Sequence, residues 1–311
     1  MGTPDTSQSA PELARRILSW YRRDGRPLPW RQTRLPYRVL LSEVMLQQTQ
    51  VSRVGQKYRE FLRQFPTLSA LARARRRDVV MAWRGLGYNN RAVRLHALAR
   101  HLHALRNNRF PRDIGALMEL PGVGRYTAHA VAAFAFGQHV PVVDVNVRRV
   151  LSRIFFRMRS TATLVDDSTA WRIAGEVLPP GRAYDWNQAL MDLGATVCTL
   201  GRPRCAACPV AALCASRAII SSAPPRQTPA RRERAHRGTP LRLFRGRLIE
   251  ALRNAHPRRS VSASRLGRTI LPRFTGRDRE VFHRLLRSLE KDGLIEVRRD
   301  RQSRQDRVSL A

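Results

Sequence analysis

All cysteines of this chain fall within one short segment, at Cys198, Cys205, Cys208 and Cys214. A disulfide framework would distribute its cysteines along the chain, whereas thiols gathered in one segment are typical of a metal site in a reducing compartment. Only Cys205 and Cys208 form a Cys-x2-Cys pair, while many zinc sites have two such pairs. From the residues alone, the segment predicts one four-thiolate site that holds zinc or an iron–sulfur cluster.

Two carboxylates lie in contexts that favour different protonation states. Asp144 ends the apolar run 140–143 and begins a helical pattern, where the N–H groups of a helix N-terminus would stabilise its anion. Glu43 adjoins an apolar helical stretch, where burial would raise its pKa and let it keep a proton near neutral pH. Taken singly, such an Asp is more often a simple helix N-cap, and such a Glu a solvated helix residue.

A glycine-containing turn separates two helical patterns, at 114–120 and 127–136. Gly122 and Gly124 flank the small apolar Val123, so the chain can reverse tightly and turn its N–H groups outward. These N–H groups and the following Arg125 lie at the N-terminus of the second helix, a position that favours a bound phosphate. The turn predicts a helix-hairpin-helix element that binds DNA; the alternative is an ordinary turn between two core helices.

The overall charge supports a polyanionic partner. The chain has 58 Lys+Arg against 23 Asp+Glu, a formal charge of +35 over 311 residues. Its 43% hydrophobic residues suffice for one large core or two ordinary ones, which excludes wholesale disorder. No apolar stretch approaches the roughly 20 residues of a membrane helix. The first residues also lack the pattern of a signal peptide, so we expect a cytoplasmic protein without membrane contact.

The pattern along the chain predicts an all-α protein followed by a small α+β module. We expect a flexible tail at residues 1–10 and a helical domain at 11–220 that ends in the cysteine segment 198–214. A linker rich in Pro, Ser, Thr and Arg is expected at 221–239. Three helical patterns at 241–255, 262–271 and 277–291, then two short alternating runs at 294–297 and 307–310, resemble a winged-helix module at 240–311.

Taken together, these motifs resemble a known enzyme superfamily. The hairpin, with Asp144 about twenty residues on, is similar to the helix-hairpin-helix glycosylases of base excision repair, related to endonuclease III. The string Ser42-Glu43-Val44-Met45-Leu46-Gln47-Gln48-Thr49 resembles the MutY-type, adenine-specific members. Gly85-Leu86-Gly87-Tyr88 and the Cys-x6-Cys-x2-Cys-x5-Cys spacing fit that family as well. The resemblance covers about residues 10 to 216.

The resemblance implies a two-lobed fold and a role for each site residue. Glu43 would be the general acid toward an adenine flipped out of the duplex, while Asp144 stays ionised and stabilises the sugar cation. Asn146 would orient that carboxylate, and Tyr126 would support it. Further DNA contacts are expected from Gln48 and Tyr88, which fill or wedge the opened duplex, and from Gly122, Val123, Gly124 and Arg125. Candidates for lining the adenine pocket are Trp30, Arg31 and Gln188.

The same resemblance implies a cofactor and a substrate. It favours a [4Fe–4S] cluster over zinc at the four cysteines, in a structural role. The substrate would be double-stranded DNA with adenine opposite 8-oxoguanine or guanine, bound by a monomer. One departure concerns the C-terminal part, which is too short and too helical to be the family's usual NUDIX-like domain. We expect it to supply DNA affinity or a partner contact, and the alternative is a small cap with a solvated Arg face.

Two other functions remain as alternatives. An endonuclease III-like enzyme that removes oxidised pyrimidines and nicks the strand needs a lysine amine just after the hairpin. Position 126 is Tyr, and the chain has only Lys57 and Lys291, neither in a matching motif. The second alternative is a non-catalytic iron–sulfur protein that binds DNA, which the joint presence of Glu43 and Asp144 disfavours.

Overall fold

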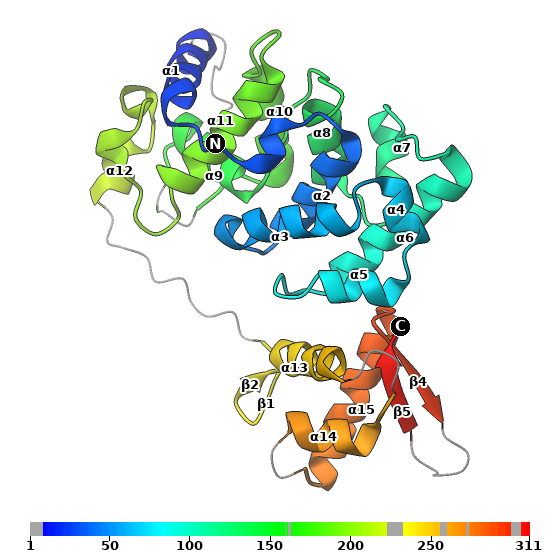
Figure 1. The fold of residues 1–311 in the computed structure, drawn as a ribbon. Coiled ribbons are helices and arrows are strands. Elements are labelled where there is room, and N and C mark those ends of the chain that lie inside the picture. The colour runs from blue at the N-terminus through cyan, green and yellow to red at the C-terminus, as the bar shows by residue number, and fades with distance from the viewer. Residues whose placement is uncertain are drawn as a thin grey trace. The chain divides into compact units, whose positions relative to one another are not determined.

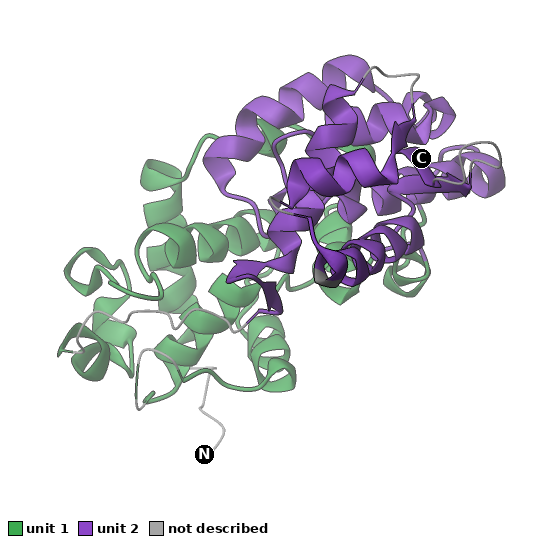
Figure 2. Cartoon of the chain, turned by 90° about the horizontal axis from the view of Figure 1, so that it is seen from below, with its two compact units in different colours: residues 1–40, 111–119, 123–230 green, residues 41–110, 120–122, 231–311 purple. Residues whose placement is uncertain are grey.

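The computed structural model describes residues 9–158, 160, 163–222, 233–255, 260–271, 274–299 and 306–311 (Figure 1). The expected tail at 1–10 therefore lies almost entirely outside the described residues. The chain forms two compact units (Figure 2). The first contains residues 1–40, 111–119 and 123–230, and the second contains 41–110, 120–122 and 231–311. Within the described part, no helix is long and apolar enough to cross a bilayer.

Helices make up the first unit. They are α1 (Ala10–Asp24), the short 3-10 turn η1 (Pro29–Gln32), the start of α2 (Pro36–Leu46), α7 (Ile114–Met118), α8 (Arg125–Phe134), α9 (Val145–Phe155), α10 (Asp167–Glu176), α11 (Ala183–Thr196), the 3-10 turns η2 (Cys205–Ala207) and η3 (Ala211–Leu213), and α12 (Arg217–Ser222). The predicted helical region is confirmed here.

The core of the first unit joins α1, α9, α10 and α11. Leu13 and Ile17 lie four positions apart on one face of α1, and both are almost fully buried. They pack in one cluster with Leu151 of α9 and with Trp186 and Leu193 of α11. Each such side chain contributes about 1.5–3 kcal/mol on burial, so this core fixes α9 and α11. Those two helices carry the predicted catalytic Asp and lead into the cysteine segment.

The second unit combines an early helical segment with the C-terminal residues. Its elements are the end of α2, α3 (Val51–Gln64), α4 (Leu68–Arg73), α5 (Arg76–Ala82), α6 (Asn90–Arg106), β1 (Ala235–His236), β2 (Thr239–Pro240), α13 (Leu241–Asn254), β3 (Val261–Ser262), α14 (Ala263–Ile270), α15 (Gly276–Lys291), β4 (Ile295–Arg299) and β5 (Asp306–Leu310). The three predicted C-terminal helices and the two predicted strands are confirmed to within a few residues.

The C-terminal strands form an antiparallel sheet in the order β3-β5-β4, with Val297 opposite Val308 and Val308 opposite Val261. A separate two-residue ladder, β1–β2, lies in and just after the segment predicted as linker, 221–239, and α12 enters that segment from the other side. Residues 223–232 of the linker lie outside the described part. Asp278 of α15 accepts hydrogen bonds from His236 and Arg237, which fastens the β1–β2 turn to the module.

Candidate active site

Asp144 caps the N-terminus of α9, as its sequence position predicts. Its Oδ1 atom accepts hydrogen bonds from the backbone N–H groups of Asn146 at 2.8 Å and Val147 at 2.7 Å. Its Oδ2 atom accepts a third from Nδ2 of Asn146 at 2.8 Å. Three donors and the helix N-terminus stabilise the ionised carboxylate. Asp144 is partly exposed, so an ionised group can reach a ligand here.

Asn146 is itself held in one orientation by Arg149, which the sequence analysis missed. Nη2 of Arg149 donates to Oδ1 of Asn146 at 2.8 Å and to the Gly194 carbonyl at 2.7 Å, and Nε donates to the Cys198 carbonyl at 2.9 Å. Because the amide oxygen faces Arg149, the amide nitrogen faces Asp144. Burial lowers the pKa of Arg149, although its neighbours Cys198 and Asp144 act in the opposite direction. The i, i+3 spacing on one helix was the available signal.

Gly194 of α11 allows this close packing. A Cβ atom at that position would lie 2.7 Å from Cβ of Asn146, closer than real Cβ contacts come. Any larger residue would push α9 away from α11 at the point where Asn146 supports Asp144. The carboxylate, its amide partner and the cysteine segment are therefore joined through one short chain of hydrogen bonds.

The predicted hairpin connects α7 to α8. Gly122 has φ +78°, a left-handed conformation that favours glycine, and Gly124 precedes the first turn of α8. Gly122, Gly124 and Arg125 are exposed, while Val123 is buried at 8% exposure. Exposed N–H groups at the start of a ten-residue helix fit the expected phosphate contact. Arg125 also stacks on the Trp171 ring, with 4.1 Å between its guanidinium carbon and the ring centroid.

Two of the three predicted pocket residues, Arg31 and Gln188, are in direct contact, and Arg31 also pairs with a buried acid that the sequence analysis missed. Arg31 donates to Oε1 of Gln188 at 2.7 Å and forms an ion pair with Asp192, with Nη2 2.7 Å from Oδ1. Arg26 pairs with the same carboxylate. Burial disfavours the charge on Asp192, yet the hydrogen bonds and charge of Arg31, then those of Arg26, lower its pKa overall. Trp30, beside Arg31 in η1, is buried at 6% exposure.

Glu43 and Tyr126 belong to different compact units of the chain. Glu43 is buried at 5% exposure on the part of α2 that belongs to the second unit. This burial agrees with the environment that the sequence predicts for a protonated acid. Tyr126 is partly buried in the first turn of α8, in the first unit with Asp144. The joint action of Glu43 with Asp144 stays a prediction.

Gln48 and Tyr88 lie on two loops that one buried arginine connects. Both residues have left-handed backbone conformations, with φ 55° and 42°, and Tyr88 is 48% exposed. Arg91, only 6% exposed, donates from Nη1 to the carbonyls of residues 44, 45 and 47. From Nη2 it donates to Oγ1 of Thr49 and to the carbonyls of residues 86 and 87. A single guanidinium therefore holds both predicted duplex-opening residues in place.

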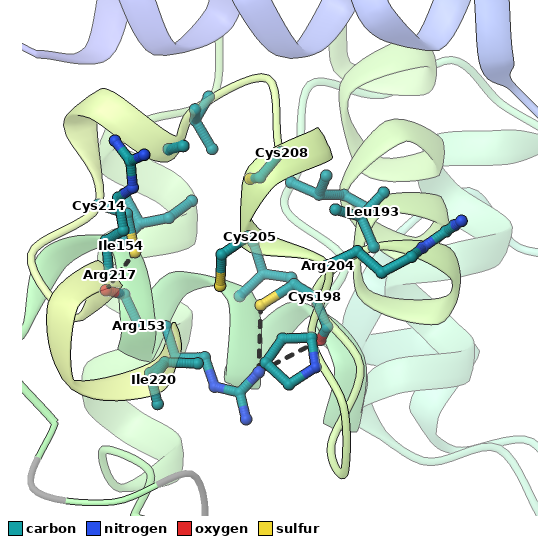
Figure 3. A pocket seen from close by; sticks show the side chains of 15 residues that line it. Arg153, Ile154, Leu193, Cys198, Arg204, Cys205, Cys208, Cys214, Arg217 and Ile220 are labelled. Atoms are coloured by element: carbon teal, nitrogen blue, oxygen red, sulfur yellow. Dashed lines mark hydrogen bonds between the residues drawn. The ribbon is translucent and has the colours of Figure 1, made fainter. Parts of the chain in front are cut away.

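The four cysteines line a single pocket, as Figure 3 shows. The cavity between them is small, with a volume of ≈ 30 Å³. Nη1 of Arg153 donates to Sγ of Cys198 at 3.3 Å, and Sγ of Cys214 donates to the Arg153 carbonyl at 3.2 Å. Burial raises the pKa of the Cys208 thiol to about 11 and raises that of Cys214 as well. In the absence of a metal these two thiols are therefore protonated at neutral pH.

The donor set of this pocket fits a metal cluster chemically. It offers four thiols and a cationic donor beside one of them, and thiolates are the ligands of iron–sulfur clusters. Among the described residues, no three His, Cys, Asp or Glu side chains come close enough to hold one metal ion. Binding would have to deprotonate the thiols, so it would release protons.

Comparison with known proteins identifies the family. The profile of the HhH-GPD superfamily of base excision DNA repair proteins matches residues 41–171, which include Glu43, the hairpin and Asp144. An adenine DNA glycosylase of Mycobacterium tuberculosis is 46% identical over 243 residues, covering 77% of this chain and 78% of that protein. The chain belongs to the adenine DNA glycosylases of the HhH-GPD superfamily. It is therefore a DNA N-glycosylase, a class of enzyme that acts in base excision repair.

Other relatives agree with this family. The adenine DNA glycosylase of Mycolicibacterium smegmatis is 41% identical over 286 residues, covering 91% of this chain and 92% of that protein. A match of this length extends into residues 231–311, so it includes much of the C-terminal module. Among solved structures, a thermostable thymine-DNA glycosylase superposes with a TM-score of 0.64 at 30% identity, covering 69% of this chain and all of that one. The predicted helix-hairpin-helix glycosylase fold is confirmed.

Proposed function

We propose that this glycosylase removes adenine paired with 8-oxoguanine or guanine in duplex DNA, by hydrolysis and without cutting the strand. The observation that carries the proposal is the Asp144 carboxylate, which accepts three N–H hydrogen bonds and follows the exposed helix-hairpin-helix turn by about twenty residues in the sequence. The names of the similar mycobacterial proteins supply the base. We further propose that the enzyme acts as a monomer on DNA in the cytoplasm.

The reaction needs a proton on the leaving base and a negative charge near the sugar. Adenine leaves poorly as an anion, so Glu43 donates its proton to a ring nitrogen of the flipped base. The bond between N9 and C1′ then breaks, and its electron pair goes to the base. Asp144 stabilises the cationic sugar that remains. The Glu43 carboxylate takes a proton from water as the water oxygen bonds to C1′, which restores the acid.

Asn146 and Arg31 would serve this reaction by positioning. Asn146 holds Oδ2 of Asp144 through its side-chain amide, while Oδ1 accepts from the two backbone N–H groups at the helix N-terminus, so the carboxylate would keep one orientation. Arg31 and Gln188, which share one hydrogen bond, would line the adenine pocket together with Trp30. Tyr126 would support the carboxylate from the first turn of α8.

The absence of strand cleavage follows from the missing amine. A glycosylase that nicks DNA through a Schiff base needs a lysine near the sugar. Position 126, next to the hairpin, is Tyr. Lys57 lies on α3 with its Nζ atom 2.6 Å from Oε2 of Glu60, and Lys291 ends α15. Neither lysine lies near Asp144 in the sequence.

We also propose that Cys198, Cys205, Cys208 and Cys214 hold a [4Fe–4S] cluster. When bound, the cluster would serve as a structural cross-link, because nothing in the proposed reaction transfers electrons. Its protein environment supports this role: Arg149 and Arg153 both donate to Cys198, at its carbonyl and its sulfur respectively. Iron and zinc contents of the purified protein, with the visible absorption of an iron–sulfur cluster, distinguish the two metals.

A single-turnover assay tests the proposed activity. Wild type, Asp144→Asn and Glu43→Gln are incubated with duplexes that contain adenine opposite 8-oxoguanine, guanine or thymine. We expect adenine release opposite the first two, strand breaks only after alkali, and a loss of at least roughly 1,000-fold for Asp144→Asn. Breaks without alkali on oxidised-pyrimidine duplexes would establish the endonuclease III-like alternative instead. DNA binding without any base release would establish the non-catalytic one.

A further inference from the structure

One tryptophan of α10 makes two ring contacts with helix α8. Trp171 is only 5% exposed. The guanidinium carbon of Arg125 lies over its indole, 4.1 Å from the ring centroid. The His129 ring meets the same indole in a T-shaped arrangement, with 4.6 Å between the centroids and 64° between the planes. Arg125 and His129 are one turn apart on α8, so one face of this helix contacts the indole at two points.

The first contact restrains the arginine that follows the hairpin. The Arg125 side chain stays 49% exposed although its guanidinium lies over the indole, so it can still bind an anion. The attraction between a cation and an indole face favours this position of the side chain. Nη1 of Arg125 also lies 4.0 Å from Oδ2 of Asp167, one turn before Trp171 on α10. Both partners of this ion pair are exposed, so the pair is weak and a phosphate group can replace the carboxylate.

The second contact extends to the segment that leads to Asp144. Nδ1 of His129 lies 2.9 Å from the carbonyl oxygen of Pro141, three residues before Asp144. A carbonyl can only accept, so Nδ1 carries the hydrogen and donates it. Burial lowers the pKa of His129 more than the hydrogen bond to Pro141 raises it, so the ring is neutral near pH 7. A neutral ring also avoids placing a second positive charge beside Arg125.

A buried amide of α11 holds the same segment. Asn187 is only 1% exposed. Its Oδ1 atom accepts from the Val142 N–H at 2.9 Å, and its Nδ2 atom donates to the Val140 carbonyl at 2.9 Å. The segment before Asp144 is therefore fixed by His129 of α8 and by Asn187 of α11, and all of these residues lie within the first unit.

We propose that Trp171 and His129 are positioning residues, which keep the predicted phosphate contact of Arg125 and the carboxylate of Asp144 in one fixed arrangement. The inference deepens the proposed function and rests on it. Through Trp171, Arg125 is already ordered when the DNA backbone arrives, so less conformational entropy is lost on binding. Through His129, the same indole supports the segment before Asp144. Because a phosphate contact fixes the DNA backbone, this arrangement decides how the sugar of the flipped nucleotide meets the carboxylate.

The first experiment asks whether Trp171 acts on DNA binding through Arg125. Affinity of the full-length protein is measured on a duplex with a non-hydrolysable 2′-fluoro-adenosine opposite 8-oxoguanine, for Trp171→Leu, Arg125→Met and the double variant. Loss of the cation–π contact and of the ordered arginine should weaken binding by about fivefold in Trp171→Leu. In the Arg125→Met background, the same change should weaken binding by less than about twofold. An equal loss in both backgrounds overturns the role of Trp171 in holding Arg125.

Two control variants separate this role from a loss of core packing, since Trp171 is also part of the core of the first unit. Trp171→Phe keeps an aromatic face for Arg125 and should restore most of the affinity that Trp171→Leu loses. Ile173→Ala removes buried atoms from the same helix, two positions away and therefore on another face. Urea unfolding gives the stability of each variant. We expect Ile173→Ala to bind DNA as wild type does. If it weakens binding as much as Trp171→Leu at similar stability, the effect is one of packing and the proposal is refuted.

The second experiment asks whether His129 acts on base release. His129→Phe keeps a ring against Trp171 and loses the donor to Pro141, whereas His129→Asn keeps an amide N–H near the position of Nδ1. The rate on bound DNA is measured in single turnover on the 8-oxoguanine:A duplex with saturating enzyme. We expect about tenfold slower release for His129→Phe, because a small displacement of a catalytic group slows a reaction strongly, and recovery of most of the rate for His129→Asn. Wild-type rates for His129→Phe, or equally slow rates for both variants, contradict a role through the Pro141 hydrogen bond.

The pattern across these variants also keeps the inference distinct from the proposed function. Base release by wild type on the 8-oxoguanine:A duplex is scored first, and its absence rejects the proposed function. The binding comparison of Trp171 and Arg125 uses a duplex that is not cleaved, so its result does not depend on that outcome. Arg125→Met should lower the affinity and leave the rate on bound DNA nearly unchanged, while His129→Phe should do the reverse. The same losses in both variants would mean that the two contacts have no separate effects, which overturns the proposal.

Discussion

Arg91 offers the sharpest test of how this chain holds its DNA-opening residues. The guanidinium donates to six backbone carbonyls and one hydroxyl, at the end of α2 and in the loops of Gln48 and Tyr88, at distances of 2.5 to 3.4 Å. Burial lowers the pKa of Arg91 to about 10, which reflects how strongly the site disfavours an unpaired cation. The free energy gained from the hydrogen bonds must therefore exceed the cost of burying the charge of Arg91.

The expected effect of Arg91→Met can be estimated from the groups that it leaves behind. Three of the carbonyls, those of Val44, Met45 and Leu86, are buried where they meet the guanidinium. An unsatisfied buried acceptor costs about 1–3 kcal/mol, and relief of the buried charge offsets part of the total. We expect the free energy of unfolding to fall by about 4 kcal/mol. Arg91→Lys keeps the positive charge but has a single nitrogen in place of the planar guanidinium. Its free energy of unfolding should therefore fall by about half as much as that of Arg91→Met.

Urea unfolding measures the stability, and Arg100→Met, an exposed arginine on the same helix, is the matched control. In Arg91→Lys the loops of Gln48 and Tyr88 lose part of their support, so we expect DNA affinity to fall by about tenfold while adenine release from bound DNA changes little. The reasoning is refuted if Arg91→Met unfolds within 1 kcal/mol of the control. It is also refuted if Arg91→Lys binds DNA as tightly as wild type.

Three further predictions concern the first unit. Arg149→Met frees the Asn146 amide to rotate, so we expect a rate of adenine release about tenfold slower at unchanged DNA affinity, measured under single-turnover conditions. The pKa of Asp192 is lowered in the folded state, so its ion pairs stabilise the protein fully above the unfolded pKa of about 4, and this stabilisation is lost as the pH falls further. Asp192→Asn should therefore have a lower free energy of unfolding near pH 7, and that free energy should change less with pH in acid. Urea titrations at several pH values measure both effects. With the proposed cluster bound, a chelator should lower the thermal midpoint of wild type. Cys208→Ser should start from that lower midpoint and show no further loss.

The sequence allowed several parts of this site to be predicted because their signals are local. Asp144 follows an apolar run and begins a helix, and the structure makes it an N-cap with three donors. The cysteine segment could be predicted as one site because the short spacing itself brings the thiols together. The C-terminal helices were predictable from their periodicity and from the capping pair Thr275 and Asp278 around the start of α15.

The missed features depend on long-range packing. The acceptors of Arg91 are mostly backbone carbonyls, which every residue has, so no residue type marked them in the sequence. Asp192 meets Arg31 across 161 positions, and an acid in a helix gives no sign of its burial. The strands β1 and β2 have two residues each, too short for any alternation to be recognised in the predicted linker. The contact of Val80 with α13 was equally hidden, because both segments appear as ordinary amphipathic helices.

Four arginines whose side chains are mostly buried explain why the near absence of lysine matters for more than the missing Schiff base. Arg31 joins Gln188 to Asp192, Arg91 joins two loops, Arg149 joins Asn146 to the cysteine segment, and Arg253 joins the C-terminal module to the residue after Tyr88. Each uses at least two nitrogens of the guanidinium, or one nitrogen with several acceptors, to connect segments far apart in the chain. A lysine has one nitrogen and a more strongly hydrated charge, so it could not hold both partners at these distances. The same residue type that makes the surface attractive to DNA therefore also fixes the groups expected to act on it.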